Sequence, residues 1–419
     1  RLSLRNTLLH GLTSGVLFLV LFQLSTAFIP ALLSSLLFAA HPVHTEAVAW
    51  VSGRSEVLAG LFALLSVFSF LKFREVSHGS SQTVTREKRM LLSLAGVTYF
   101  LALSSKEIAA PLPLALFFLE TFFRKEEESV QQNTHYRPYT AFAVALMLYL
   151  AFRIAALGTV SVPLEHIRTE GLSFAARLLL MGPVIAHYVM LQVFPVGLRI
   201  EYDWIDFPPV VTLGSFFLLT SVVFLGVFFS RKKYRFGAFG ILWFFLFLLP
   251  VSNIIPIGEL MAERFLYLPS AGLSLLALSL LVHTPTIYQR KIVIAMLTLL
   301  SIFSVLTLQR NKDWRDPESF WRGTLALSPN APHAIHNLSA LLLAKGELPE
   351  ARTLLARGME AWPTKASLRM LAAQMEAQVG NSDKAAELFE ETLLLAGPHD
   401  LDMTDFQRGS ILLQLERLK

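Results

Sequence analysis

The stretch HPVHTEAVAWVSGRSE crowds ionisable side chains between two strongly apolar runs. A charged group at membrane depth costs about 3 kcal/mol or more, so it is by default a candidate functional residue. The stretch holds more such groups than an aromatic anchor at the membrane interface requires, although a solvated turn anchored by a tryptophan is the simpler alternative. The candidates here are His41, His44, Glu46, Trp50, Arg54 and Glu56.

Two further polar breaks interrupt apolar runs, SSKE and IGELMAERFLYLPS. If the apolar helices form a compact bundle, Lys106 and Arg264 converge with Arg54 at one edge of the membrane. Three cations at that edge suit a lipid-linked phosphate, because ammonium and guanidinium groups form charge-assisted hydrogen bonds to phosphate oxygens. The simpler alternative is a local charge pair in each break, Lys106 with Glu107 and Glu263 with Arg264.

The segment GLRIEYDWIDFPP alternates acidic and aromatic side chains. This combination suits sugar recognition, since carboxylates accept hydrogen bonds from hydroxyl groups and aromatic rings can stack on pyranose faces. A solvated surface loop accounts for the pattern equally well. The residues concerned are Glu201, Tyr202, Asp203, Trp204 and Asp206.

No metal site is predicted. His41, His44 and Glu46 could bring two imidazoles and a carboxylate together on a turn, but no third histidine has suitable spacing. A proton relay through the same side chains is a further alternative. The chain has no cysteine, which excludes disulfides and thiolate metal ligands.

The composition indicates a polytopic membrane protein. Of 419 residues, 54% are hydrophobic and 16% are charged, whereas ordinary soluble domains carry roughly 25% charge. The formal net charge of +5 comes from Lys and Arg gathered in short loops between apolar runs. The positive-inside rule explains that distribution, so nucleic-acid binding is not inferred.

Apolar runs recur through the first 312 residues. A helix needs about 20 residues to cross ~30 Å of hydrocarbon, and several runs are shorter. An additional stretch at 174–194, interrupted by Gly182 and Pro183, is expected either to cross or to lie in the interface. We predict ten crossings, near residues 7–24, 27–40, 57–73, 90–104, 108–123, 138–157, 210–229, 235–250, 268–283 and 292–309.

Taken alternately, these crossings place most basic loop residues on one side, which is expected to be cytoplasmic. This arrangement requires the 174–194 stretch not to cross. The opposite, lumenal or periplasmic side receives residues 41–56, 104–107, 158–209, 253–268 and everything after 309.

After residue 313 the sequence becomes a helical pattern rich in Ala, Leu and Glu. A shift of 34 residues superposes Gly346 on Gly380 and Ala351 on Ala385. This is the period of tetratricopeptide repeats, whose helix pairs stack into a solenoid. A generic pair of helical hairpins is the alternative. We predict an all-α chain with a membrane domain over 1–312 and a repeat α-solenoid over 313–419, with repeats at 334–363 and 368–398 and partial repeats at 317–329 and 404–418.

Several of these stretches resemble a known family. The transmembrane and tetratricopeptide-repeat-containing (TMTC) protein O-mannosyltransferases and their bacterial relatives are similar in the type and order of the segments. Residues 41–54 are the most specific part of the resemblance. It rests on LLFAAHPVHTEAVAWVSGRSEVLAGLFALLS, LSSKEIAAPLPLALFF, MAERFLYLPSAGLSLL and RNKDW, followed by the repeats.

The resemblance implies a polytopic helix bundle of the lipid-phosphosugar-dependent (GT-C-like) glycosyltransferase class. It also implies transfer of mannose, or another hexose, from a polyprenyl or dolichyl phosphate to Ser or Thr of acceptor proteins, on the lumenal or periplasmic side and with inversion. Membrane lipid, the lipid-linked sugar donor and an acceptor protein, bound in part by the repeats, are the expected partners. No other cofactor is expected.

The chemistry assigns roles to the candidates. A carboxylate takes the proton of the acceptor hydroxyl, and cations stabilise the departing phosphate. In this class the essential acid usually lies in the first lumenal loop, which is expected upstream of Arg1. The candidates are Glu46, Glu107 and Asp203 for the carboxylate, Arg54, Lys106 and Arg264 for the lipid phosphate, and His41, His44, Trp50 and Tyr202 for substrate binding.

Two other functions fit part of the pattern. A membrane-anchored scaffold without catalysis would recruit a partner through the repeats, but it would not need ionisable groups at three helix breaks. A transporter or flippase of lipid-linked sugars would place polar groups near the bilayer midplane instead of at one edge.

Overall fold

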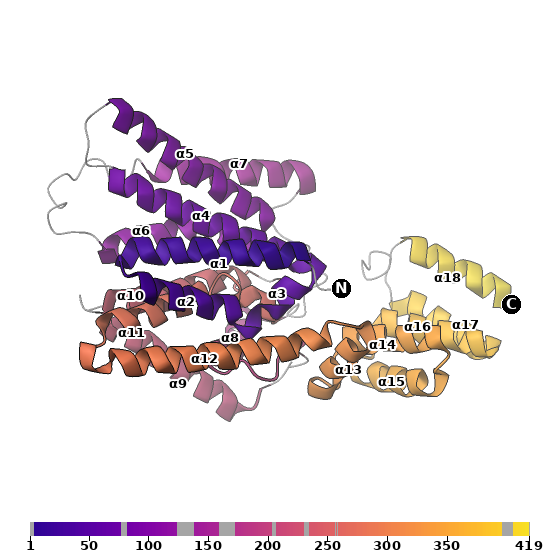
Figure 1. Cartoon of the computed structure of the whole chain (residues 1–419). Helices are drawn as coiled ribbons and strands as arrows, with labels where there is room; N and C mark the ends of the chain where they lie inside the picture. Colours follow the sequence, from indigo (N-terminus) through magenta and orange to yellow (C-terminus); the bar gives the residue numbers. More distant parts are fainter. Residues whose placement is uncertain are drawn as a thin grey trace.

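The computed structural model describes residues 4–76, 82–123, 138–158, 172–202, 207–229, 234–255, 257, 259–395 and 405–418. Within these residues the chain is all-α and contains no strand, which confirms the predicted fold class. The first part of the chain forms a helix bundle, and the last helices extend beyond one end of it (Figure 1).

The bundle contains long helices joined by short polar breaks. Its helices are α1 (Leu4–Ser25), α2 (Phe28–Ala40), α3 (Thr45–Ala49), α4 (Arg54–Val76), α5 (Gln82–Ser105), α6 (Leu112–Phe123), α7 (Tyr139–Leu157), α8 (Phe174–Val193), α9 (Pro209–Phe229), α10 (Arg235–Leu248), α11 (Ala271–His283) and α12 (Thr286–Asp313). All ten segments predicted to cross a membrane are therefore helical.

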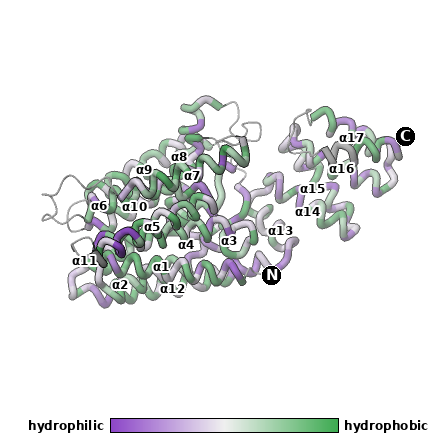
Figure 2. Tube along the Cα trace, turned by 90° about the horizontal axis from the view of Figure 1, so that it is seen from above, coloured by the Kyte–Doolittle hydropathy of each residue, from purple (hydrophilic) through white to green (hydrophobic). Residues whose placement is uncertain are grey.

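Six of the described helices are long and apolar enough to cross a membrane, and a seventh span results if α2 is counted with the bent segment that follows it. The six are α1, α4 with the turn before it, α7, α8, α9 and α12. The tube in Figure 2 is mostly hydrophobic along the bundle, whereas hydrophilic residues are more frequent along the last helices.

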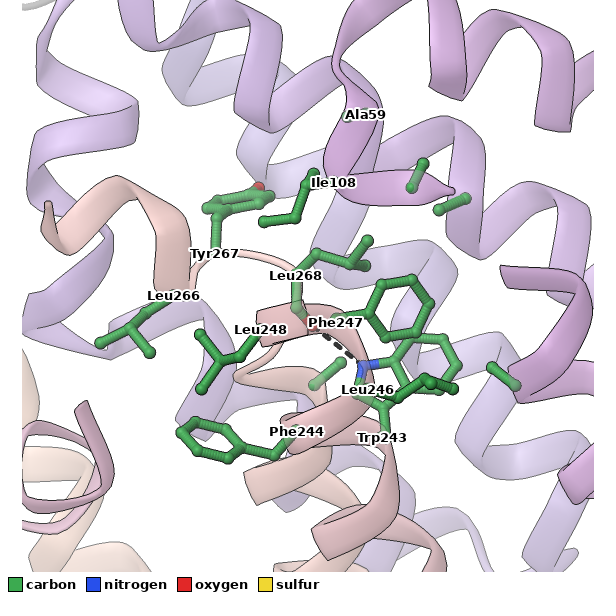
Figure 3. Packing of buried hydrophobic residues seen from close by; sticks show 14 of the residues in the cluster. Ala59, Ile108, Trp243, Phe244, Leu246, Phe247, Leu248, Leu266, Tyr267 and Leu268 are labelled. Atoms are coloured by element: carbon green, nitrogen blue, oxygen red, sulfur yellow. Dashed lines mark hydrogen bonds between the residues drawn. The ribbon is translucent and has the colours of Figure 1, made fainter. Parts of the chain in front are cut away.

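The bundle core forms where α4 packs between α1 and α5, and where α11 packs between α10 and α2. The backbones of α10 and α11 touch, since a Cβ on Gly240 would lie 2.5 Å from the carbonyl oxygen of Gly272. In Figure 3 the α10 side chains meet the loop before α11, and the indole nitrogen of Trp243 donates to the Leu268 carbonyl at 3.0 Å. These contacts fix that loop against the bundle.

We call the end of the bundle that carries residues 41–54, 106–111 and 259–270 the site end. The segment that contains α8 enters and leaves at this same end of the bundle. The preceding helix α7 finishes there, because Arg153 pairs with Glu107. The following helix α9 leads into α10, whose first turn lies at the other end, where Phe236 and Phe123 are 5.0 Å apart. The chain between α7 and α9 thus starts and finishes at the site end, as the predicted alternation of loops requires.

The remaining helices form stacked pairs after α12, whose last residue lies at the predicted boundary of the membrane domain. The first helices of the two pairs start 34 residues apart, and each ends at a glycine with positive φ, Gly346 at 80° and Gly380 at 87°. Such left-handed glycines commonly end helices. The helices are α13 (Pro317–Leu327), α14 (Pro332–Lys345), α15 (Leu348–Ala361), α16 (Ala366–Val379), α17 (Ser382–Leu395) and α18 (Asp405–Leu418).

Candidate active site

The polar breaks at the site end share one local form, an extended residue followed by a 3-10 turn. Trp50, Lys106 and Ala262 are extended, and the turns that follow are Val51–Gly53, Glu107–Ala109 and Glu263–Leu266. Successive side chains of an extended segment point to opposite sides, and in a 3-10 turn, with about three residues per turn, successive side chains also point in different directions. Charged residues that are neighbours in sequence are therefore directed to different partners.

Arg264 forms an ion pair with Glu46, which lies on the short helix α3. The Glu46 carboxylate is fully buried and accepts from the backbone N–H of Arg264 at 2.9 Å and from its guanidinium group at 2.5 Å. The guanidinium carbon lies 5.3 Å from the centre of the Trp50 ring. Glu46 and Trp50 together hold this cation in one place.

Lys106 pairs with Glu56 at the start of α4, and the Glu56 side chain is only 1% exposed. The Lys106 ammonium and the Arg264 guanidinium carbon each lie 5.1 Å from the centre of the Phe265 ring, so at most twice that distance separates the two cations. The second carboxylate oxygen of Glu56 is buried without a hydrogen-bond partner in the described part of the chain. The predicted convergence of Lys106 and Arg264 is therefore present.

Arg54 lies beside the same cluster. Its Nε donates to the Asn6 side chain at 3.1 Å, and Asn6 in turn donates to the Trp50 carbonyl at 2.8 Å. The turn before Arg54 is tight, because a Cβ on Gly53 would lie 2.4 Å from the Ala47 carbonyl oxygen. Among the residues that the structure describes, Arg54 is the cation of the three without a carboxylate partner.

Glu107 points away from Lys106. It pairs with Arg153 of α7 and accepts from the Tyr149 hydroxyl at 3.2 Å, and its side chain is half exposed. Glu263 likewise turns away from Arg264 and faces Arg310 of α12, with 3.8 Å between their nearest charged atoms. The alternative of two local charge pairs is therefore wrong.

Glu263 is the most deeply buried acid of the loop before α11. It accepts from the backbone N–H of Arg199 and from the Tyr202 hydroxyl, the latter at 2.9 Å. Burial raises the pKa of the Glu263 carboxyl to about 7, while Arg310 acts in the opposite direction. Sequence reasoning did not single out Arg310 or Arg153, although a cation in the last turns of an apolar helix was a usable signal for both.

His41 and His44 lie inside the bundle, and both rings are buried. The Nε2 of His41 donates to the Gln192 carbonyl at 3.1 Å, and its Nδ1 accepts from the backbone of Val43. The Nδ1 of His44 donates to the Phe38 carbonyl at 2.8 Å, and its Nε2 lies 2.7 Å from the hydroxyl of Ser270. These bonds join α2, α8 and the loop before α11, and substrate binding by either ring stays a prediction.

The remaining candidates belong to the segment after α8. Tyr202 is buried and bonded to Glu263. Asp203 lies outside the described residues, as do Trp204 and Asp206. No group of three or more potential metal ligands occurs among the residues that the structure describes.

A groove of about 600 Å³ runs between α5 and α7 on the outside of the bundle. Its lining changes from Arg89 and Thr140, far from the site end, to Phe100 and Phe152 nearer to it. Arg153, which follows directly in sequence, reaches Glu107 at the site end. The described lining of the groove therefore ends at Phe100 and Phe152, short of the polar cluster.

Comparison with known proteins identifies relatives along most of the chain. The Caenorhabditis elegans protein O-mannosyl-transferase F38B6.6 is 26% identical over 329 residues, which cover 76% of this chain and 44% of that protein. The Drosophila melanogaster protein O-mannosyl-transferase Tmtc1 is 25% identical, over 86% of this chain and 52% of that protein. The mouse protein O-mannosyl-transferase TMTC4 is 25% identical, over 75% of this chain and 47% of that protein.

The chain spans about half the length of the curated relatives it matches. No family model matches the chain. No solved structure matches it significantly.

Proposed function

We propose, from the premise that this chain is related over three quarters or more of its length to the TMTC protein O-mannosyl-transferases, that it is a membrane glycosyltransferase acting on proteins. In this proposal it transfers mannose, or another hexose, from a polyprenyl or dolichyl phosphate to a Ser or Thr hydroxyl. The supporting observation is that Lys106 and Arg264 both lie against the Phe265 ring at the site end, while Arg54 is linked through Asn6 to the Trp50 carbonyl.

The three cations would bind the phosphate of the donor. Lys106 and Arg264 are oriented by Glu56 and Glu46, so they need little reorganisation when an anion arrives. Arg54 has no carboxylate partner in the described chain, and its remaining donors can reach an incoming oxygen. As the bond between the sugar and the phosphate breaks, these cations would stabilise the charge that develops on the leaving phosphate.

The groove between α5 and α7 supports a lipid-linked donor. Its apolar half, around Phe100 and Phe152, leads toward Lys106 and Arg153. A lipid with one anionic group and a long hydrocarbon chain suits this arrangement, in which an apolar groove runs toward cationic side chains. We propose that the isoprenoid chain lies along this groove with the phosphate at the site end.

The acceptor hydroxyl needs a base, because a neutral alcohol is a poor nucleophile. Glu46 is fully buried and accepts two hydrogen bonds from Arg264, which favours a role in positioning that cation. Glu107 is half exposed, and Asp203 follows the buried Tyr202 in sequence. We propose Glu107 and Asp203 as the candidates that take the proton while the hydroxyl oxygen attacks the anomeric carbon in line, giving inversion.

The sidedness follows from the charges of the loops. Basic side chains at the other end of the bundle include Arg86, Lys88, Arg235, Arg290 and Lys291. The positive-inside rule assigns that end to the cytoplasm. We propose that the site end faces the lumen of the endoplasmic reticulum or the periplasm, where protein acceptors are available.

Transfer of labelled mannose tests the proposal. The full-length protein in vesicles receives dolichyl or polyprenyl phosphate mannose and a Ser/Thr peptide, and the wild type is compared with Arg54→Ala and Lys106→Ala. Each variant is expected to lose about 100-fold or more in rate, whereas Lys291→Ala, an exposed cation at the other end, retains full activity. Absence of transfer by the wild type from either donor would contradict the proposal and favour the scaffold.

A further inference from the structure

Residues 199–202, which follow α8, touch both the bundle and the repeat helices, and we call them the bridging segment. Its residues Arg199, Glu201 and Tyr202 are buried, each less than 9% exposed. The charged side chains of Arg199 and Glu201 both form hydrogen bonds to the ends of repeat helices. The segment therefore joins the bundle to the repeat helices at a point far in sequence from the link between α12 and α13.

Arg199 binds the C-terminal end of α13. One of its guanidinium nitrogens donates to the carbonyl of Leu327, the last residue of that helix, at 2.6 Å. The last carbonyls of a helix have no partner within the helix, and they carry its negative partial charge. The guanidinium carbon also lies 4.6 Å from the centre of the Tyr202 ring, which holds the side chain in place.

Glu201 binds the N-terminal end of the next helix, α14. One carboxylate oxygen accepts from the backbone N–H groups of His333 and Ala334, both at 3.1 Å. The other oxygen lies 2.8 Å from the Nδ1 of His333. The N-cap position of α14 is Ala331, whose side chain cannot cap a helix. A residue 132 positions earlier in the chain thus supplies the cap that the repeat itself lacks.

The other face of the bridging segment binds the candidate phosphate site. The carboxylate of Glu263 accepts from the backbone N–H of Arg199 and from the Tyr202 hydroxyl. Glu263 directly precedes Arg264, which holds Glu46. The first repeat helices and the loop that carries Glu263 and Arg264 are consequently bound to the same four residues.

We propose that the bridging segment holds the repeat array in a fixed position relative to the phosphate site, and that Glu201 is a positioning residue for polypeptide acceptors bound by the repeats. The proposal rests on the proposed function. A rigid array presents a bound acceptor at a high effective concentration, whereas a loosely attached one spreads it over a large volume. Short peptides, which reach the site without the repeats, gain nothing from this arrangement.

The position of the array is measured first, independently of activity. The chain has no cysteine, so spin labels can be attached through Ser104→Cys on α5 and Thr353→Cys on α15, both exposed. In the full-length protein in lipid nanodiscs, we expect one narrow distance distribution. Glu201→Ala is expected to broaden it, and Glu201→Gln, whose amide oxygen still accepts hydrogen bonds, to restore most of it.

The matched control is Glu347→Ala. Glu347 occupies the N-cap position of α15, is exposed and makes no capping hydrogen bond. This variant is expected to leave the distance distribution unchanged. An unchanged narrow distribution in Glu201→Ala would overturn the bridging role.

Transfer kinetics test the second half of the proposal. The acceptors are a long unfolded Ser/Thr-containing polypeptide and a short peptide taken from its sequence. Glu201→Ala is expected to raise KM for the long acceptor about tenfold or more, with kcat and both constants for the short peptide unchanged. An equal rise in KM for both acceptors, or an unchanged KM for both, would overturn the positioning role. If the wild type transfers nothing, the proposed function fails, and the spin-label distances still decide the bridging role.

Discussion

The bundle and the repeat array use the same charged residue types in different ways. At the site end of the bundle the acidic partners Glu46, Glu56 and Glu263 are at most 1% exposed. In the first repeat helices Arg322 is 41% exposed, and its partner Glu350 is 43% exposed. Water thus reaches both partners of this array pair, whereas the acids of these three bundle pairs are shielded from it.

The difference has an energetic consequence. Removing one partner of a buried pair leaves an uncompensated charge and costs about 3–5 kcal/mol. Removing one partner of an exposed pair costs about 0–1 kcal/mol, since water replaces it. Breaking a buried pair at the site end is therefore costly, whereas the exposed pair of Arg322 with Glu350 contributes little to stability.

The largest expected effect comes from Glu46→Ala, which removes the buried carboxylate from the Arg264 guanidinium and leaves only the half-exposed Glu259 at 3.9 Å. We expect the free energy of unfolding to fall by about 3–5 kcal/mol. Chemical denaturation in detergent micelles, followed by tryptophan fluorescence, measures this change. The control is Glu318→Ala in the array, where we expect the denaturation midpoint to stay nearly unchanged, since water replaces the lost partner. Equal losses of unfolding free energy in the two variants would contradict the distinction between the regions.

Gly240→Ala is expected to have the next largest effect. The added methyl would lie 2.5 Å from the Gly272 carbonyl oxygen, so α10 and α11 must separate. Overpacking of this kind costs about 1–3 kcal/mol. The same substitution at Gly323 of α13 meets no atom within 4 Å, and we expect it to stabilise the array by about 0.5–1 kcal/mol. Thermal unfolding of both variants provides the comparison, and a stabilised Gly240→Ala would contradict the close contact of α10 with α11.

A smaller, pH-dependent effect is expected where the regions meet. The hydrogen bond to Glu201 raises the pKa of His333, with Glu259 adding to the shift and Lys365 opposing it. A raised folded-state pKa contributes stability that is complete below the unfolded value of about 6.5 and is lost as the pH rises through the folded value. The distance distribution between the spin labels should therefore broaden at alkaline pH.

Glu201→Gln is the control for this pH dependence, because it removes the charge that raises the pKa of His333. We expect the distribution of this variant to be the same at about pH 6 and about pH 8. A distribution that broadens equally in the wild type and in the variant would assign the effect to another group.

The smallest effect is expected from Arg322→Ala. This guanidinium bridges Glu318 and Glu350 on the surface of the array. The free energy of unfolding is expected to change by about 1 kcal/mol or less, and the change should shrink further in high salt. A loss as large as that of Glu46→Ala, measured by the same denaturation, would show that exposure does not distinguish the two regions.

Sequence reasoning located the helices well, because apolar runs and capping glycines are local signals. All ten segments predicted as crossings are helical, and Gly346 and Gly380 end helices at the expected period. The 174–194 stretch was harder, since its length and composition suit a span, whereas the predicted alternation of loops requires it not to cross.

The candidate site was predictable only in part. The sequence indicated that Arg54, Lys106 and Arg264 would gather, since each lies at a polar break on the same predicted side of the membrane. It did not indicate a role for Arg153 or for Arg310, although Arg310 is the first residue of the stretch RNKDW that forms part of the family resemblance. Asp203 remains a prediction, because it lies outside the described residues.

By itself, the sequence determined where the helices lie and which breaks between them carry charge, because hydrophobic periodicity and helix-breaking residues act over a few positions. Only the tertiary structure decided the partners. Lys106 pairs with Glu56 across 50 positions and Arg264 with Glu46 across 218, although each has an acid directly beside it in sequence. The physical reason is that successive side chains in these extended residues and 3-10 turns point in different directions, and burial then selects whichever opposite charge the packed helices bring within reach.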